Sequence, residues 1–340
     1  MAETFVISRG ASDEVEVVFV ELRHDGVRGF GEATPIERYR ESAESALAFI
    51  EESAPLLGDD PFALEEIGER LALRPGEQAA KAALDAALHD LCGKLVGLPV
   101  WKLLGLRRAG PPTSWTIWLG NPEDMARRAE LVRGRFKRLK LKLGGRDGLD
   151  LDRVRAVRAV SDVPLQVDVN EYWRLDEALD ALPQLAELGV EYCEQPLPAG
   201  DPDGSELRRR SPMPIYVDED CHTLADVPVC AERAHGLTVK LAKAGGIREA
   251  IRIAHAGRAL GLGLMLGCMN ESGLAVSAGA QIASLFDRVD LDGNLLLAED
   301  PWPGVELVDG VQLPPDAPGL GVRHAYESVT EAAPPRRDSS

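Results

Sequence analysis

Short apolar segments typical of strands recur along the second part of this chain, and segments with helical periodicity separate most of them. Repeated strand–helix units imply parallel strands joined by right-handed crossovers. Eight such strands within roughly 190 residues predict an α/β fold of the (β/α)8 barrel type. The expected strands cover 113–118, 138–143, 164–169, 190–194, 214–218, 237–241, 262–267 and 289–292, and the clearest helices cover 150–160, 176–188 and 246–260.

A doubly wound sheet is the alternative arrangement for repeated strand–helix units. That fold usually carries a glycine-rich phosphate loop directly after its first strand. Here the first strand is followed by Leu119-Gly120-Asn121-Pro122, which lacks the pattern, and the glycines between Gly261 and Gly267 flank a strand. The barrel is therefore favoured.

The first part of the chain has a different pattern. The Asp25-Gly26 pair predicts a hairpin turn between two strands, and three helices should follow it. The expected strands are 15–22 and a second one toward 31–33, and the expected helices are 43–50, one that starts near Pro61, and 77–96. These elements predict an α+β domain over 1–110 and place the barrel at 111–300. The composition of 331–340 predicts a disordered tail.

Charged residues stand where the predicted barrel strands end. The carboxyl ends of the strands form the face of a barrel on which chemistry takes place. The steps from Lys142 to Asp168, Glu194, Asp218 and Lys240 are 26, 26, 24 and 22 residues, or one strand–helix unit each. These five side chains are therefore expected to converge on one cavity. Further polar residues at strand ends are Lys140, Asn170, Glu219, Lys243, Asp290 and Asp292.

Three carboxylates from neighbouring strands, Asp168, Glu194 and Asp218, make an oxygen-only site. No histidine or cysteine shares their register, so Mg²⁺ or Mn²⁺ fits this site better than zinc does. Because three clustered acids repel one another, a bound cation is expected among them.

The chain has only 8 lysines among its 38 basic residues, and lysine, unlike arginine, can accept a proton near neutral pH. Lys140 and Lys142 precede the three acids, and Lys240 follows them. A nearby cation lowers the pKa of a lysine, which suits it to act as a general base. A metal that binds a substrate carboxylate can stabilise the enediolate that forms when the α-proton leaves. Bases on opposite sides of that carbon permit racemisation or epimerisation.

Each of these residues alone has an ordinary explanation. A single aspartate at a strand end usually caps a turn or helix, and an isolated Lys-x-Lys pair is usually a solvated strand face. Five such residues in register on consecutive strands favour the functional interpretation. Among the six histidines only His222, just after the fifth strand, is placed to face the cavity.

The net charge of −18 argues against nucleic-acid partners and against anionic membrane surfaces. The sequence shows no transmembrane run, and its first residues lack the features of a signal peptide. Five scattered cysteines without a CxxC pair indicate reduced thiols and a cytoplasmic location.

Five motifs resemble those of the enolase superfamily, in its muconate-cycloisomerase-like subgroup. The resemblance implies a capping domain over a modified barrel, with residues 301–330 returning to the cap and specificity loops around 32–40. It implies that Asp168, Glu194 and Asp218 bind Mg²⁺, that Lys142 and Lys240 are the acid/base catalysts, and that Lys140 is a supporting cation. The motifs are Lys140-Leu-Lys142, Asp168-Val-Asn170 with Trp173, Glu194-Gln195-Pro196, Asp218-Glu219, and Lys240-Leu-Ala-Lys243-Ala-Gly-Gly246.

Two further segments resemble the dipeptide epimerases, whose namesake activity is that of L-Ala-D/L-Glu epimerase. They are Gly267-Cys268-Met269-Asn270-Glu271-Ser272 and Asp290-Leu291-Asp292-Gly293. In that group the Asp-x-Asp pair binds the α-ammonium of the dipeptide. Two carboxylates at positions i and i+2 share a face and suit the three donors of an ammonium. The bland alternative is a polar turn before Gly293.

The side chain that the substrate carries stays open between acidic, hydrophobic and cationic. Asp220 stands where relatives more often carry a small polar residue, and negative charge there would disfavour an anionic substrate. Arg38 and Arg40, in the expected cap loop, favour the opposite conclusion, because either could pair with a glutamate side chain.

The resulting hypothesis is a Mg²⁺-dependent epimerase acting on the Cα of the C-terminal residue of an L-Ala-Xaa dipeptide. Cys268, Met269, Asn270 and Arg38 would contact the substrate, and Asn170, Glu219 and Lys243 would support the site. The alternatives are an o-succinylbenzoate synthase, an N-acylamino acid racemase or a cycloisomerase on the same scaffold, and a non-catalytic ligand-binding barrel. Which lysine serves which face, and whether the chain forms a homo-oligomer, stay open.

Overall fold

The computed structural model describes residues 1–325. The tail expected at 331–340 lies outside these residues. Within the described range, no helix has both the length and the apolar character that a membrane crossing requires.

Eight parallel strands form the central sheet, and their spatial order follows their order in the chain. A bridge between Thr113 and Val289 brings the first and last strands together, so the sheet closes into a barrel. The (β/α)8 prediction is thereby confirmed. The strands are β5 (Trp115–Ile117), β6 (Leu139–Lys142), β7 (Leu165–Asp168), β8 (Val190–Glu194), β9 (Ile215–Val217), β10 (Gly236–Lys240), β11 (Gly263–Gly267) and β12 (Arg288–Asp290).

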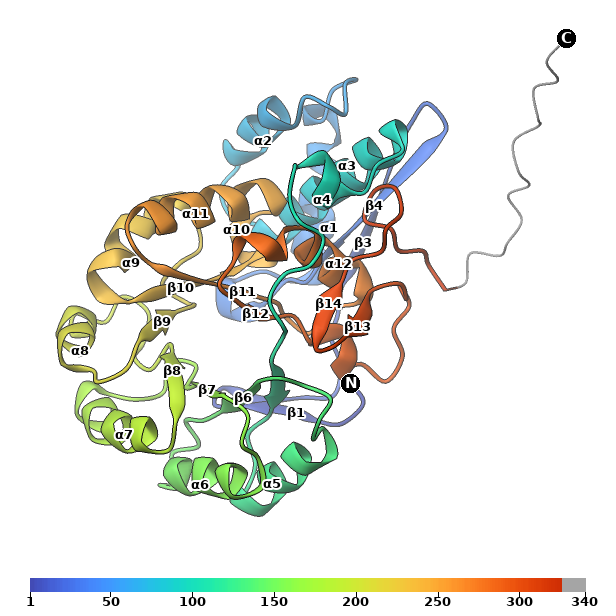
Figure 1. The fold of residues 1–340 in the computed structure, drawn as a ribbon. Coiled ribbons are helices and arrows are strands. Elements are labelled where there is room, and N and C mark those ends of the chain that lie inside the picture. Colours follow the sequence, from blue (N-terminus) through green and yellow to red (C-terminus); the bar gives the residue numbers. More distant parts are fainter. Residues whose placement is uncertain (326–340) are drawn as a thin grey trace, which may run out of the picture.

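Helices form an outer ring around these strands (Figure 1). The first of them has a regular N-terminal cap: the Asn121 side chain accepts a hydrogen bond from the Asp124 N–H, and Pro122 occupies the first turn. A short 3-10 turn, and not an α-helix, follows the eighth strand, so the barrel departs from strict repetition there. The helices are α5 (Pro122–Leu131), α6 (Asp150–Val160), α7 (Leu175–Glu187), α8 (Gly204–Arg210), α9 (Val227–Arg233), α10 (Leu241–Ala244), α11 (Ile247–Ala259) and α12 (Gly273–Ile282), and the 3-10 turns are η3 (Leu224–Asp226), η4 (Ala283–Leu285) and η5 (Gly293–Leu296).

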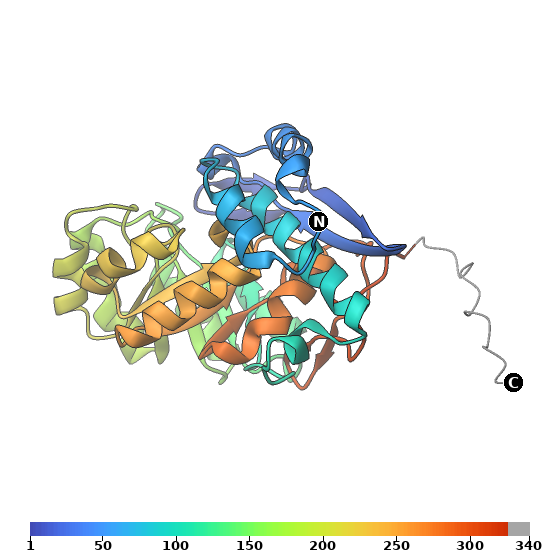
Figure 2. The same cartoon turned by 90° about the horizontal axis from the view of Figure 1, so that it is seen from above.

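The N-terminal elements through α4, which we call the cap, gather on one side of the barrel (Figure 2). Strands β3 and β4 pair antiparallel around the predicted Asp25-Gly26 turn. Helix α3 packs closely on β4, and a Cβ atom at Gly31 would lie 2.0 Å from the Ala83 carbonyl oxygen, so this contact requires glycine. The cap comprises β1 (Phe5–Ile7), β2 (Gly10–Ser12), β3 (Val18–His24), β4 (Val27–Ala33), η1 (Glu37–Tyr39), α1 (Ala43–Ser53), η2 (Ala54–Leu56), α2 (Leu64–Ala72), α3 (Gln78–Val96) and α4 (Val100–Leu103).

The last described residues contact the cap. The Trp302 ring lies 5.0 Å from that of Phe30, and the Leu320 N–H donates to Asp90 of α3 over 2.7 Å. Between them the chain forms the hairpin of β13 (Glu306–Val308) and β14 (Val311–Leu313).

Candidate active site

The parallel register of the barrel brings the predicted residues to one level. Lys142 pairs with Asp168 across β6 and β7, and Asp168 pairs with Glu194 across β7 and β8. On the far side, Lys240 of β10 pairs with Gly267, which pairs with Asp290 of β12. The predicted charged residues therefore meet at the carboxyl ends of the strands.

A cavity of about 960 Å³ opens at this level, between the barrel and the cap. Five predicted charged residues do not reach its wall but are buried beside it. They are the carboxylates Asp168, Glu194, Asp218 and Glu219 and the ammonium of Lys243. The predicted residues that line it are Lys140, Lys142, Asn170, Lys240, Cys268, Met269, Asn270, Asp290, Asp292 and Arg38.

Lys140 is almost completely buried, with 2% of its surface exposed. Its Nζ lies 2.7 Å from Glu194 Oε2, 2.7 Å from Asp290 Oδ2 and 3.1 Å from Asp168 Oδ2. Burial alone would lower the pKa of this ammonium, but the carboxylates outweigh burial and raise it well above the ordinary value. Lys140 is thus held charged, as a supporting cation must be.

The two proposed acid/base lysines each pair with one carboxylate. Lys142 Nζ lies 2.7 Å from Asp168 Oδ2 and donates to Asn170 Oδ1 over 3.1 Å, and Lys240 Nζ lies 2.8 Å from Asp218 Oδ2. Burial lowers the pKa of Lys240, but Asp218 outweighs burial and raises the pKa above its ordinary value. This differs from the expected lowering, because a carboxylate and not a cation is the nearest charge.

Lys243 does not face the cavity. Its Nζ is ion-paired with Asp218 and donates to the carbonyl oxygens of Asp218, Cys221 and Thr238, over 2.5, 3.0 and 3.1 Å. These contacts hold Asp218 in place directly after β9, so Lys243 supports the site without lining the cavity. Burial alone would raise the pKa of Asp218, but Lys240 and Lys243 outweigh it and lower the pKa below its usual range.

The residues expected to hold the metal fit a hard divalent cation in their chemistry. Both carboxylate oxygens of Glu194 are buried and accept no hydrogen bond in the described chain, although Lys140 forms an ion pair with one of them. Burial, followed by the negative charge of Asp168, raises the pKa of Glu194 to about 7. A clustered, under-paired carboxylate of this kind calls for a cation.

The same residues do not stand ready-made around an ion. Among residues 1–325, no three acidic, histidine or cysteine side chains form a metal-binding arrangement. Lysine ammonium groups lie against the carboxylates instead, as the contacts of Lys140 with Asp168 and Glu194 demonstrate.

Asp290 and Asp292 both lie at the cavity and are at most 5% exposed. Asp290 is paired with Lys140 and accepts a hydrogen bond from the Ser114 hydroxyl. The backbone N–H of Thr116 donates to Asp292 over 2.6 Å. Burial and then the charge of Asp290 raise the pKa of Asp292 to about 7.

The cap is tied to the barrel mouth partly by residues that sequence analysis did not find, namely Arg9, Glu171 and Tyr39. Arg9, at the turn between β1 and β2, contacts Glu219 at 2.7 Å and Glu171 at 3.3 Å. Glu171 also receives two hydrogen bonds from Arg38, of 2.9 and 2.8 Å. We call Arg9, Arg38 and Glu171 the clamp. Tyr39, beside Arg38, places its ring edge-on to that of His222 at 4.5 Å.

Arg38 is therefore engaged with Glu171, although it was expected to meet a substrate side chain. Asp220 was expected to add negative charge near the substrate, but it is paired with residues outside the cavity wall. Its carboxylate accepts hydrogen bonds of 2.8 Å from Gln195 and from the Gly200 N–H, and it is ion-paired with Arg233 at 3.4 Å. Asp220 does not line the cavity. Its contacts stabilise the loop that contains Gly200, and its charge is not presented to the substrate.

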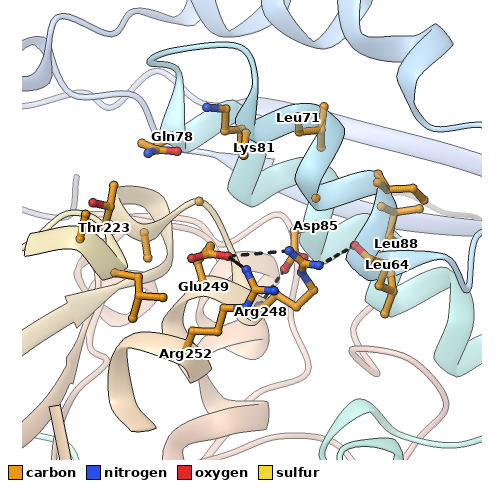
Figure 3. Close-up of a pocket in the computed structure, with 17 residues that line it drawn as sticks. Leu64, Leu71, Gln78, Lys81, Asp85, Leu88, Thr223, Arg248, Glu249 and Arg252 are labelled. Atoms are coloured by element: carbon orange, nitrogen blue, oxygen red, sulfur yellow. Dashed lines mark hydrogen bonds and ion pairs between the residues drawn. The ribbon is translucent and has the colours of Figure 1, made fainter. Parts of the chain in front are cut away.

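A second cavity, of about 330 Å³, lies between α2 and α3 of the cap and α11 of the barrel. Figure 3 shows Arg248, Glu249 and Arg252 crowded at its floor, with Asp85 facing them from α3. Arg248 donates to the Leu64 carbonyl oxygen over 2.8 Å, and Arg252 donates to Glu249 over 2.6 Å. The contacts of Arg248 join the cap to the barrel.

Comparison with known proteins agrees with this geometry. Residues 1–105 match the family described as mandelate racemase / muconate lactonizing enzyme, N-terminal domain, and residues 124–328 match that described as enolase C-terminal domain-like. The L-Ala-D/L-Glu epimerase of Bacteroides thetaiotaomicron is 37% identical, over 95% of this chain and 85% of that protein. A hydrophobic dipeptide epimerase of a Flavobacteria bacterium is 38% identical, over 93% of each chain.

A solved structure is similar over nearly the same length. The dipeptide epimerase of Enterococcus faecalis, complexed with Mg and the dipeptide L-Leu-L-Tyr, superposes with a TM-score of 0.90 at 31% identity. The superposition covers 95% of this chain and 96% of that one. The chain described here therefore belongs to the mandelate racemase / muconate lactonizing enzyme family of the enolase superfamily.

Proposed function

We propose that the protein is a dipeptide epimerase, an isomerase that inverts the Cα of the C-terminal residue of a dipeptide. The observation that carries the proposal is the placement of Lys142 and Lys240. They end strands β6 and β10, which are four strands apart in the order of the eight-stranded barrel. Strands so separated lie on opposite sides of a closed barrel, so the two lysines face the cavity from opposite directions.

Asp168, Glu194 and Asp218 are the residues that would hold the magnesium ion. A bound Mg²⁺ would neutralise part of the carboxylate charge that raises the pKa of Lys240, and it would stabilise negative charge on the substrate carboxylate. The relatives whose structures contain Mg and a dipeptide support this assignment.

Residues of the chain itself carry out proton transfer, stabilise negative charge and bind the substrate ammonium. One of Lys142 and Lys240 takes the α-proton through Nζ, and the other returns a proton to the opposite face of the carbon. Lys140, held charged, stabilises negative charge that develops on the substrate carboxylate. Asp292, with Asp290 beside it, receives the α-ammonium of the first residue.

The test is proton exchange at Cα. The purified protein is incubated with Mg²⁺ and a panel of dipeptides in D₂O, and deuterium incorporation and epimerisation are followed by NMR. We expect both for at least one L-Ala-L-Xaa substrate. Lys240→Ala should lower epimerisation by about 10²- to 10⁴-fold, the usual contribution of an acid/base group, and leave exchange from only one of the two epimers. The proposal would fail if no dipeptide exchanged, or if Lys240→Ala exchanged both epimers at the original rates.

A cytoplasmic location is part of the same proposal. The five cysteines are all free, and four of them are buried. Thiols kept in this state are typical of a reducing compartment.

A further inference from the structure

The charges that line the cavity differ in how they are paired. Five cationic side chains reach its wall: Arg9, Arg38, Lys140, Lys142 and Lys240. Each one already forms an ion pair with a carboxylate of the protein. An acidic substrate side chain would have to displace one of these partners, and the displaced carboxylate would then lose its counter-charge.

Three exposed acids of the cap wall, by contrast, have no ion-pair partner among residues 1–325; Glu41, the fourth acid there, is buried and accepts hydrogen bonds from the Gln78 and Ala79 N–H groups. Glu14, Glu16 and Glu37 line the cavity and are exposed, and none of the three forms an ion pair within the described chain. They stand on two segments, one after β2 and one at η1, that face the same space. The cap side of the cavity therefore carries unbalanced negative charge, which attracts cations and repels anions.

Apolar side chains lie beside these acids on the same wall. Phe5, Ile7, Val15 and Ile36 line the cavity and are half-buried. An apolar surface bordered by exposed carboxylates matches a side chain with an aliphatic stem and a charged tip.

We propose that the C-terminal residue of the substrate carries a cationic side chain of the lysine or arginine type. The inference rests on the proposed function, which places the Cα between Lys142 and Lys240 and the ammonium at Asp290 and Asp292. The side chain of the C-terminal residue can then extend toward the part of the wall that the cap supplies. The aliphatic stem lies along the apolar residues, and the cationic tip lies at Glu14, Glu16 and Glu37.

The experiment compares kcat/KM for L-Ala-L-Lys, L-Ala-L-norleucine and L-Ala-L-Glu. Norleucine has a stem like that of lysine without the charge, so it separates charge from size. We expect lysine to exceed norleucine by roughly fivefold, the effect of a few exposed charge pairs, and glutamate to be the poorest substrate. Added salt should narrow the lysine advantage, because exposed charges are screened.

Variants assign the preference to residues. Replacing Glu14, Glu16 and Glu37 together by Gln should bring the ratio of lysine to norleucine close to one. Glu44→Gln, which removes an exposed acid that does not line the cavity, should leave the ratio unchanged. Glu171→Ala removes both oxygens that accept the hydrogen bonds of Arg38, so it should raise activity on L-Ala-L-Glu relative to the other two substrates.

The outcomes are distinguishable. Exchange that is no faster for lysine than for norleucine, or a lysine preference that survives the triple substitution, overturns the inference and leaves the epimerase proposal standing. Absence of exchange with every dipeptide overturns both.

Discussion

At the scale of single residues, Asp292 couples binding to stability. Its pKa is raised to about 7 by burial and then by Asp290, against about 3.9 in an unfolded chain. Between these values the folded state holds a proton that the unfolded state has lost, so stability falls as the pH rises from about 4 to 7. Asp292→Asn cannot ionise, so it removes this loss of stability at high pH, and its amide oxygen still accepts the hydrogen bond from the Thr116 N–H. The variant should unfold a few degrees higher than the original protein at pH 8, and at the same temperature near pH 4.

The same substitution should impair function. A charged hydrogen bond is worth about 1.5–3 kcal/mol, so kcat/KM for the preferred dipeptide should fall roughly 10- to 150-fold. Any activity on the N-acetylated dipeptide, which lacks the ammonium, should not fall. Asp316→Asn, an exposed position away from the cavity, serves as the control. A variant that keeps full activity on the free dipeptide, or gains no thermal stability at pH 8, would contradict this account of Asp292.

At the scale of elements, the clamp determines how the cap loop sits over the cavity. Arg38 is 42% exposed on its side chain, so solvent screens its pair with Glu171, which is then worth about 1 kcal/mol or less. Arg38→Ala should therefore raise KM about two- to fivefold, while kcat changes less than twofold because no reacting group moves. Arg40→Ala, two residues along the same loop and exposed, should change neither constant. A fall in kcat at constant KM would assign Arg38 to the chemical step instead.

The elements also explain what the sequence could and could not predict. Strand ends such as those at Asp168 and Glu194 follow from apolar runs spaced by one strand–helix unit, so the barrel and the grouping of charges were predictable. The hairpin of β1 and β2 was missed, because strands of three residues show no alternation over a useful length. Arg9 at its turn contacts Glu219, 210 residues away, and no local pattern encodes a contact of that kind.

The sequence also could not predict which charged side chains form ion pairs with one another. Arg38 was expected to be free for substrate and Asp220 to add charge to the site, yet each is held by a partner from another segment. Propensity and spacing predict where a charge lies along the chain. Whether that charge is satisfied depends on the packing of loops, as the bonds from Gln195 and Gly200 to Asp220 illustrate.

At the scale of the whole molecule, metal binding should be visible as stability of the fold. Asp168 and Glu194 end strands β7 and β8, and Asp218 directly follows β9. An ion held by all three joins these consecutive strands only in the folded state. Ligand that binds the folded state alone stabilises it by about 1.4 kcal/mol at ten times the dissociation constant and by about 2.7 kcal/mol at a hundred times. Protein treated with EDTA should therefore gain several degrees in Tm when MgCl₂ is added, relative to NaCl of equal ionic strength.

Two variants separate this effect from general charge screening. Glu194→Gln removes a proposed metal ligand, so it should abolish the rise in Tm with Mg²⁺. It also removes the repulsion between Glu194 and Asp168, so it should not lower the Tm measured in EDTA. Glu271→Gln alters another buried acid, whose pKa burial and then Glu32 raise to about 8, and it should keep the full response. Equal responses from the two variants would place the ion elsewhere in the barrel. Loss of the response in Glu194→Gln alone would assign the stabilising ion to the strand ends that face Lys142 and Lys240.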